Sequence, residues 1–148
     1  MSIKASQEYD KDFYGWVFHN AALIRAGRFH EVDAEHVAEE LESMGKSDKR
    51  ELINRLALLM AHLLKWQYQS VRRSKSWRLT IKEQRIQIRQ LLEESPSLKH
   101  EIATKLDAAY EQAVVAVEIE TALDESTFPA RCPFTLDECL DSSFFPDI

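Results

Sequence analysis

Residues 52–64 read LINRLALLMAHLL, and this stretch decides the fold. Its apolar side chains recur at helical spacing over more than three turns, and they form a wide stripe along the helix that they predict. The stripe consists of Leu52, Ile53, Leu56, Leu59, Met60, Leu63 and Leu64. A stripe this wide is typical of the central and most buried helix of a bundle. We expect this helix to begin after Ser47 and to emerge into solvent near Val71.

The composition of the whole chain favours helices. Among 148 residues there are only three glycines and four prolines. Good helix formers (Ala, Leu, Glu, Lys, Arg and Gln) dominate, and no stretch shows the sustained alternation that is typical of strands. This length fits one domain with a single core. The sequence therefore predicts an all-α protein, a single-domain bundle of about five helices over residues 1–148.

Four further helices are predicted around the central one. The first covers about residues 9–26 and ends at Gly27, which can adopt the left-handed conformation of a helix end. The second begins after Asp33 and stops at Gly45. The fourth starts at the capping box formed by residues 80–83, TIKE. The fifth starts at residues 95–96, a serine followed by proline, and reaches about residue 123.

The C-terminal segment is rich in aromatic residues. Residues 135–138 read TLDE and predict a short capped turn, and SSFFPDI closes the chain. We expect Phe134, Leu140, Phe144 and Phe145 to pack back onto the bundle, because a free tail rarely carries so many large apolar side chains. The segment is thus predicted to be extended and packed.

Several features point to the cytoplasm. Only Cys132 and Cys139 are present, so no disulfide framework is implied and a reducing compartment suits the chain. No apolar run approaches the roughly 20 residues that a membrane span needs. The first residues lack the apolar core of a secretory signal. We expect a cytoplasmic protein that does not engage a membrane.

The net charge of −6 hides a strong internal asymmetry. Residues 1–50 carry −3, residues 51–100 carry +6 and residues 101–148 carry −9. The basic block is concentrated in residues 65–89, where aromatic side chains interleave with eight basic ones. This pattern predicts a binding patch that consists of Arg72, Arg73, Lys75, Trp77, Arg78, Lys82 and Arg85.

Two interpretations of this patch remain open. Basic side chains neutralise phosphates and exposed aromatics stack on bases, so nucleic-acid binding is one hypothesis. The protein as a whole is acidic, however, which weakens long-range attraction of a polyanion. The acidic C-terminal third also offers an internal partner, since the fifth helix could lay its carboxylates against Lys82, Arg85 and Arg89.

A metal site is a weaker hypothesis. His36 and Glu40 are separated by one helical turn, and His62 could add a ligand if the helices that carry them are antiparallel neighbours. The order of these residues matches neither the zinc peptidase motif nor the di-iron motif. A boundary histidine that makes one hydrogen bond also explains His62. No serine or cysteine has a recognisable catalytic context, so we predict no catalytic residue and no cofactor.

Several long segments carry a family resemblance. These are DFYGW near the N-terminus, VDAEHVAEELESMGKSDKREL, HLLKWQYQSVRRSKSWRLTI and the closing CPFTLDECLDSSFFP. Over about residues 9–146 the chain resembles the bacterial family known as domain of unknown function 29. The resemblance implies a small all-helical bacterial protein without an assigned activity, and it supplies no catalytic residues.

Three functions are therefore considered. The first is a non-enzymatic protein-interaction or regulatory module, which binds an unknown protein partner or forms a homodimer. The second is a nucleic-acid-binding regulator that uses the basic and aromatic region of residues 65–89. The third is a metal-dependent enzyme built on His36, Glu40 and His62.

Overall fold

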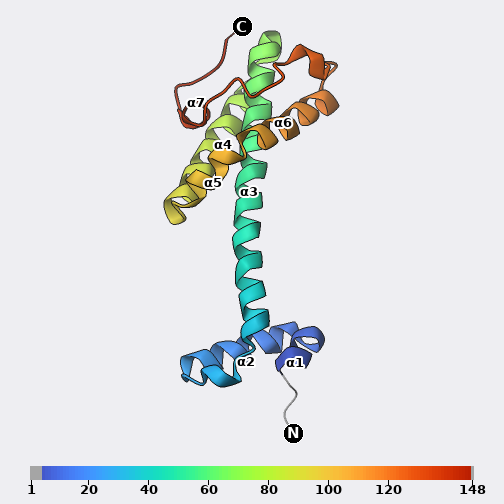
Figure 1. Ribbon diagram of the computed structural model, residues 1–148. Coiled ribbons are helices and arrows are strands. Elements are labelled where there is room, and N and C mark those ends of the chain that lie inside the picture. The colour runs from blue at the N-terminus through green and yellow to red at the C-terminus, as the bar shows by residue number, and fades with distance from the viewer. Residues whose placement is uncertain (1–4, 148) are drawn as a thin grey trace. The chain divides into compact units, whose positions relative to one another are not determined.

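The computed structural model describes residues 5–147, and helices make up 77% of it (Figure 1). No β-strand occurs in this part of the chain, so the all-α prediction is confirmed. The chain divides into two compact units, unit 1 (residues 1–47) and unit 2 (residues 48–148). Helix α3 (Ala34–Tyr68) contributes residues to both units. The single domain over residues 1–148 stays a prediction.

Unit 1 begins with two helices where one was predicted over residues 9–26. Helix α1 (Ala5–Lys11) ends at Asp12, and helix α2 (Phe13–Arg25) starts directly after it. The continuous helix was wrong because Asp12 leaves the helical conformation and its carboxylate accepts a hydrogen bond from the backbone N–H of Gly15 at 3.0 Å. Gly27 ends α2 with a φ of 74°, as the sequence predicts.

The predicted stop at Gly45 and restart after Ser47 were also wrong, because α3 runs through both positions without a break. A glycine inside a helix costs only about 1 kcal/mol relative to alanine. Good helix formers flank Gly45 on both sides in this 35-residue helix, and they outweigh that cost. Gly45 is exposed, and apart from its chain neighbours and the backbone of its own helix no atom lies within 4 Å of the position that a Cβ would take.

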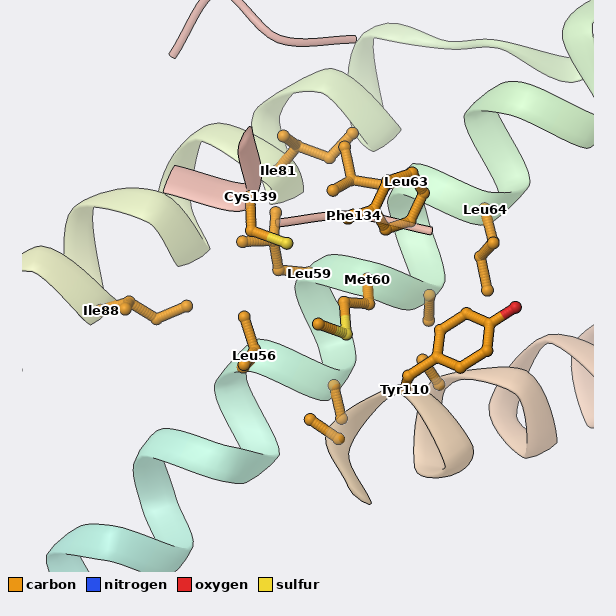
Figure 2. Packing of buried hydrophobic residues seen from close by; sticks show 14 of the residues in the cluster. Leu56, Leu59, Met60, Leu63, Leu64, Ile81, Ile88, Tyr110, Phe134 and Cys139 are labelled. Carbon is orange, nitrogen blue, oxygen red and sulfur yellow. The ribbon is translucent and has the colours of Figure 1, made fainter. Parts of the chain in front are cut away.

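The core of unit 2 forms around the stretch that opened the sequence analysis. Leu56, Leu59, Leu63 and Leu64 of α3 are completely buried. Figure 2 shows these side chains converging with Ile81 and Ile88 of helix α4 (Lys75–Glu94), Tyr110 of helix α6 (Leu106–Glu120), and Phe134 and Cys139 of the C-terminal segment. The central, most buried helix is therefore the one that the sequence predicts.

The boundaries of α4 and of the predicted last helix differ from the predicted ones. Helix α4 begins at Lys75, where Ser74 accepts a hydrogen bond from the N–H of Trp77 at 3.2 Å. The capping box at residues 80–83 was wrong because Ser74 caps the helix earlier and leaves Thr80 in its interior. The predicted start of the last helix at residues 95–96 was wrong, because Ser95 is the C-cap of α4 and the next helix begins at Leu98. The predicted last helix is also divided at Lys105 into helix α5 (Leu98–Thr104) and α6. Short 3₁₀ turns occupy Phe29–Glu31, Ser70–Arg72 and Glu125–Thr127.

The C-terminal segment packs onto unit 2, as predicted. Thr135 and Glu138 form the expected capping box, which starts helix α7 (Leu136–Leu140). Phe134 is buried, and Leu140, Phe144 and Phe145 are partly buried against the core. Within residues 5–147, no helix combines the length and the apolarity that crossing a membrane requires.

Candidate functional site: a cationic groove on helix α4

Helix α4 turns one face to the core and another to a groove. Ile81 and Ile88 are fully buried on the core side. The groove has a volume of about 630 Å³, and the C-terminal segment forms its opposite wall. We call it the α4 groove; its lining consists of Arg78, Leu79, Lys82, Arg85, Ile86, Arg89, Ser142 and Phe145. Four of these eight side chains are cationic, and three are apolar.

Arg85 is the most unusual member of the groove. It is only 2% exposed, and its guanidinium lies 5.4 Å from the centre of the Phe145 ring. Its Nε donates to the carbonyl oxygen of Cys139 and its Nη2 to that of Phe144, each at 2.7 Å. Among the residues that the structure describes, no aspartate or glutamate pairs with it. The positive charge is therefore buried against two carbonyl dipoles and the Phe145 ring, and the Asp141 carboxylate attracts it without forming a direct pair.

This environment has an electrostatic consequence. Burial lowers the pKa of the Arg85 guanidinium, because desolvation disfavours its charged form. Arg89, one turn further along α4, also donates to a backbone carbonyl, that of Leu140. The Asp141 carboxylate attracts both guanidinium groups but pairs directly with neither. An anionic group that entered the groove could form the direct pair, because arginine can hold a carboxylate through two parallel hydrogen bonds.

The structure divides the predicted binding patch. Arg78, Lys82 and Arg85 line the α4 groove, and Arg78 and Lys82 are exposed. The lining does not include the remaining four residues, Arg72, Arg73, Lys75 and Trp77. Arg72 and Lys75 are exposed, while Arg73 donates to the carbonyl oxygen of Trp66 at 2.7 Å and pairs with Asp147 at 3.2 Å.

The sequence predicts a pairing of α4 cations with the acidic last helix, but the described residues pair differently. Lys65, rather than Lys82, Arg85 or Arg89, pairs with an acid of α6, and its Nζ lies 2.6 Å from Glu120. Arg85 and Arg89 are engaged by carbonyl groups of the C-terminal segment instead. The acidic helix therefore leaves the α4 groove uncovered.

The aromatic side chains of the basic region are in contact with other residues of unit 2. The ring of Trp66 contacts Phe145 and carries Arg73 at 5.0 Å from its centre. Lys65 lies 5.4 Å from the centre of the Trp77 ring, and Tyr68 packs edge-on against Phe128. Ring faces that already carry side chains are poorly available for stacking on bases.

Arg89 is the cation of the groove that the predicted patch omitted. A signal for it is present in the sequence, because the cations at 78, 82, 85 and 89 follow one helical face at spacings of four, three and four residues. Ser142 and Phe145, which the C-terminal segment contributes, carry no such signal, since their position depends on how that segment folds back.

The three metal candidates are engaged in other contacts. His36 Nδ1 lies 2.7 Å from Asp33 Oδ2, and its ring stacks on Tyr9. Glu40 accepts a hydrogen bond from the Tyr9 hydroxyl. His62 Nδ1 lies 3.0 Å from the carbonyl oxygen of Leu58, and burial lowers the pKa of its imidazole. In the described part of the chain, no three His, Cys, Asp or Glu side chains are grouped as a metal site would require.

A second cavity, of about 650 Å³, lies beside α6. Its wall includes three acids, Asp107, Glu111 and Glu125, together with Arg131. The Tyr110 hydroxyl, which would otherwise be a free polar group in this wall, donates to the carbonyl oxygen of Pro129 at 2.7 Å. All four charged side chains of this wall are exposed, so the cavity contains no desolvated charge comparable to that of Arg85.

These features define a small all-α protein with a cationic groove between a helix and a folded-back C-terminal segment. The chain belongs to the family described as domain of unknown function DUF29, whose sequence profile matches residues 8–145. This match covers nearly the whole chain and confirms the resemblance drawn from its motifs. No curated protein and no solved structure matches the chain.

Proposed function

We propose that this chain is a non-enzymatic protein-interaction module of the bacterial cytoplasm, and that the α4 groove is its binding surface. The partner would present an acidic helical segment with apolar side chains. The observation that carries the proposal is the buried guanidinium of Arg85, which faces the groove without a carboxylate partner among the described residues. A carboxylate from a partner would compensate that desolvated charge.

The apolar members of the groove support a protein partner. Leu79 and Ile86 are 47% and 43% exposed, and they follow the cations along α4 with the same helical spacing. A helix that alternates carboxylates with aliphatic side chains would match both rows, as amphipathic helices do in other hydrophobic grooves. A polynucleotide would use the cations but would gain little from these aliphatic side chains.

The contacts that the aromatic rings already make also favour a protein partner over a nucleic acid. A nucleic-acid surface without sequence preference combines cations with free aromatic faces. Trp66, Trp77 and Tyr68 all contact neighbouring side chains of unit 2. Nucleic-acid binding is thus the second candidate, and it would depend on the exposed Arg72 and Lys75 as much as on the groove.

A binding measurement tests the proposal with a matched pair of variants. The probe is a fluorescein-labelled helical peptide in which glutamates alternate with leucines at helical spacing, followed by anisotropy. Lys82→Glu and Lys75→Glu make the same charge change at two exposed positions of the same helix, but only Lys82 lines the groove. We expect Lys82→Glu to weaken binding about tenfold, or about 1.4 kcal/mol, and Lys75→Glu to weaken it much less.

Three results would contradict the proposal. The first is equal weakening by the two variants, which would indicate attraction by diffuse charge. The second is a labelled single-stranded oligonucleotide that binds more tightly than the peptide and responds equally to both variants, which would favour the nucleic-acid regulator. The third is the absence of peptide binding at low ionic strength, where screening is weakest.

A further inference from the structure

The first turns of α3 present an acidic surface. Glu35, Glu39 and Glu42 lie on one face of the helix, at spacings of four and three residues, and all three are exposed. We call these residues the acidic stripe. No cation pairs with any of them within the described part of the chain. Glu40 is excluded from the stripe because it is turned toward Tyr9.

An apolar row accompanies the acidic stripe. Ala38 and Leu41 are exposed on the neighbouring face of α3, and Leu41 is 63% exposed. This segment of the chain therefore has the two properties of the partner proposed for the α4 groove. These are carboxylates at helical spacing and an adjacent aliphatic side chain.

The spacing of the two charged rows is the same. Cations of the α4 groove follow at steps of four, three and four residues from Arg78 to Arg89, and the acidic stripe follows at steps of four and three. Because an α-helix rises about 1.5 Å per residue, three charges extend over about 10.5 Å on each helix. Three carboxylates can thus face three cations when the two helices lie side by side. Lys82 and Arg85 take part whether the helices run parallel or antiparallel.

We propose that the acidic segment that occupies the α4 groove is the acidic stripe of a second copy of this chain. The proposal rests on the proposed function, because it names the partner of the same groove. Each copy carries one stripe and one groove, and in the proposed dimer each stripe occupies the groove of the other copy, which gives two equal contacts. The two contacts would reinforce each other, since forming the first raises the effective concentration for the second.

Charge decides against the most direct alternative dimer. Unit 1 also exposes aromatic side chains on α2, among them Tyr14 at 76% and Phe18 at 57%. Pairing two copies through unit 1 would bring together two acidic surfaces, because residues 1–47 contain nine acidic and five basic side chains. Like charges across an interface disfavour it, whereas the stripe and the groove attract each other.

The test is a charge exchange, read out as mass by sedimentation equilibrium over a range of concentrations. One variant carries Glu35→Lys, Glu39→Lys and Glu42→Lys, and the other carries Arg78→Glu and Lys82→Glu. All five side chains are exposed, so both variants are expected to keep the helical circular dichroism of the unmodified chain. Arg85 is left unchanged because its burial makes it part of the fold.

We expect the unmodified chain to reach twice its 17.2 kDa mass as its concentration rises, and to return to 17.2 kDa on dilution or at high salt. Each variant alone should dimerise at least tenfold more weakly. An equal mixture should dimerise again, because the lysine stripe of one variant then faces the glutamate-bearing groove of the other. In that mixed dimer the unmodified stripe faces the unmodified groove.

Different failures have different meanings. If the acidic peptide binds the groove but the chain keeps a mass of 17.2 kDa at every concentration, the dimer is wrong and the proposed function stands. If each variant dimerises as well as the unmodified chain, the copies meet elsewhere and the dimer through the groove is wrong. If the peptide fails to bind and no dimer forms, both proposals are wrong.

Discussion

Unit 1 and unit 2 are stabilised by different kinds of contact. In unit 2, eighteen buried side chains form one hydrophobic cluster around α3. In the described part of unit 1, Trp16 and Leu23 are the two buried apolar side chains. Polar contacts supplement them: Trp16 Nε1 donates to Asp33 at 3.0 Å, and the buried Asn20 accepts a hydrogen bond from the N–H of Asp33 at 2.9 Å. One chain thus combines a packed core with a small hydrogen-bonded cluster.

The difference has a thermodynamic consequence. Chains below about 40 residues seldom bury enough apolar surface to fold alone, and they commonly depend on oligomerisation or other support. Unit 1 is close to this size and exposes large apolar side chains, such as Tyr14, Phe29 and Leu41. We therefore place unit 1 at the low end of local stability and the α3–α4 core of unit 2 at the high end.

The largest effect should come from opening a cavity in unit 2. Leu56→Ala removes a fully buried side chain, and we expect it to lower the free energy of unfolding by about 3 kcal/mol. Tyr14→Ala removes a larger side chain that is 76% exposed, and it should cost less than about 0.5 kcal/mol. Urea unfolding followed by circular dichroism measures both. Similar losses for the two variants would break the contrast between the units.

An intermediate effect, with a gain of stability, is expected at Gly45. Gly45→Ala should raise the free energy of unfolding by about 0.4–1 kcal/mol, because alanine fits the helix and restricts the unfolded chain. Gly27→Ala is the matched control and should destabilise, since its φ of 74° is unfavourable for alanine. A higher urea midpoint for Gly45→Ala and a lower one for Gly27→Ala would confirm both expectations. A loss at Gly45 would show that α3 needs a glycine there.

The smallest effect depends on pH and involves the hydrogen-bonded cluster of unit 1. The hydrogen bond that the His36 ring donates to the Asp33 carboxylate raises the pKa of His36 above 6.5. The contribution of His36 to stability is therefore complete below pH 6.5 and is lost as pH rises through the raised pKa. Burial works against ionisation of Asp33, but hydrogen bonds from His36 and Trp16 prevail and lower its pKa below 3.8. Its contribution is present above pH 3.8 and is lost as pH falls through the lowered pKa.

An NMR titration of the His36 ring checks this expectation. The imidazole should titrate above 6.5 in the unmodified chain, and its pKa should fall in Asp33→Asn, which keeps a hydrogen-bond acceptor but removes the charge. Both groups contribute to stability between about pH 4 and 6.5. In this range the amide protons of α2 should therefore exchange more slowly than the pH dependence of the intrinsic exchange rate alone would give. A His36 pKa that is unchanged by Asp33→Asn would show that the pair does not stabilise unit 1.

Much of unit 2 could be predicted from the sequence because its core depends on periodicity. The stripe over residues 52–64 identified the central helix, and Thr135 with Glu138 identified the last capped one. Helix ends were less predictable, since Gly45 and Thr80 are residues that end or begin helices in one context and lie inside them in another. The choice depends on free-energy differences of about 1 kcal/mol, which neighbouring residues easily outweigh.

The candidate site could be predicted only in part. The charge pattern predicts Arg85 as part of a binding patch, although it lies between Ile81 and Ile88 at the spacing of the buried face. That spacing was the available signal for its burial. Its partners could not be predicted, because they are backbone carbonyls of residues more than 50 positions away. Every residue has a backbone carbonyl, so the amino-acid sequence does not indicate which of them will accept a hydrogen bond from Arg85.

The link between Arg85 and the C-terminal segment also bears on how the chain is made. Arg85 and Cys139 are 54 residues apart. At about 5–20 residues per second, a ribosome adds the second partner roughly 3–11 s after the first. During that interval α4 can pack against α3, but the carbonyl groups that accept hydrogen bonds from Arg85 do not yet exist. The guanidinium of Arg85 therefore stays in water. The charge of Arg85 can therefore be buried against these carbonyl groups only after synthesis has supplied the C-terminal segment that completes unit 2.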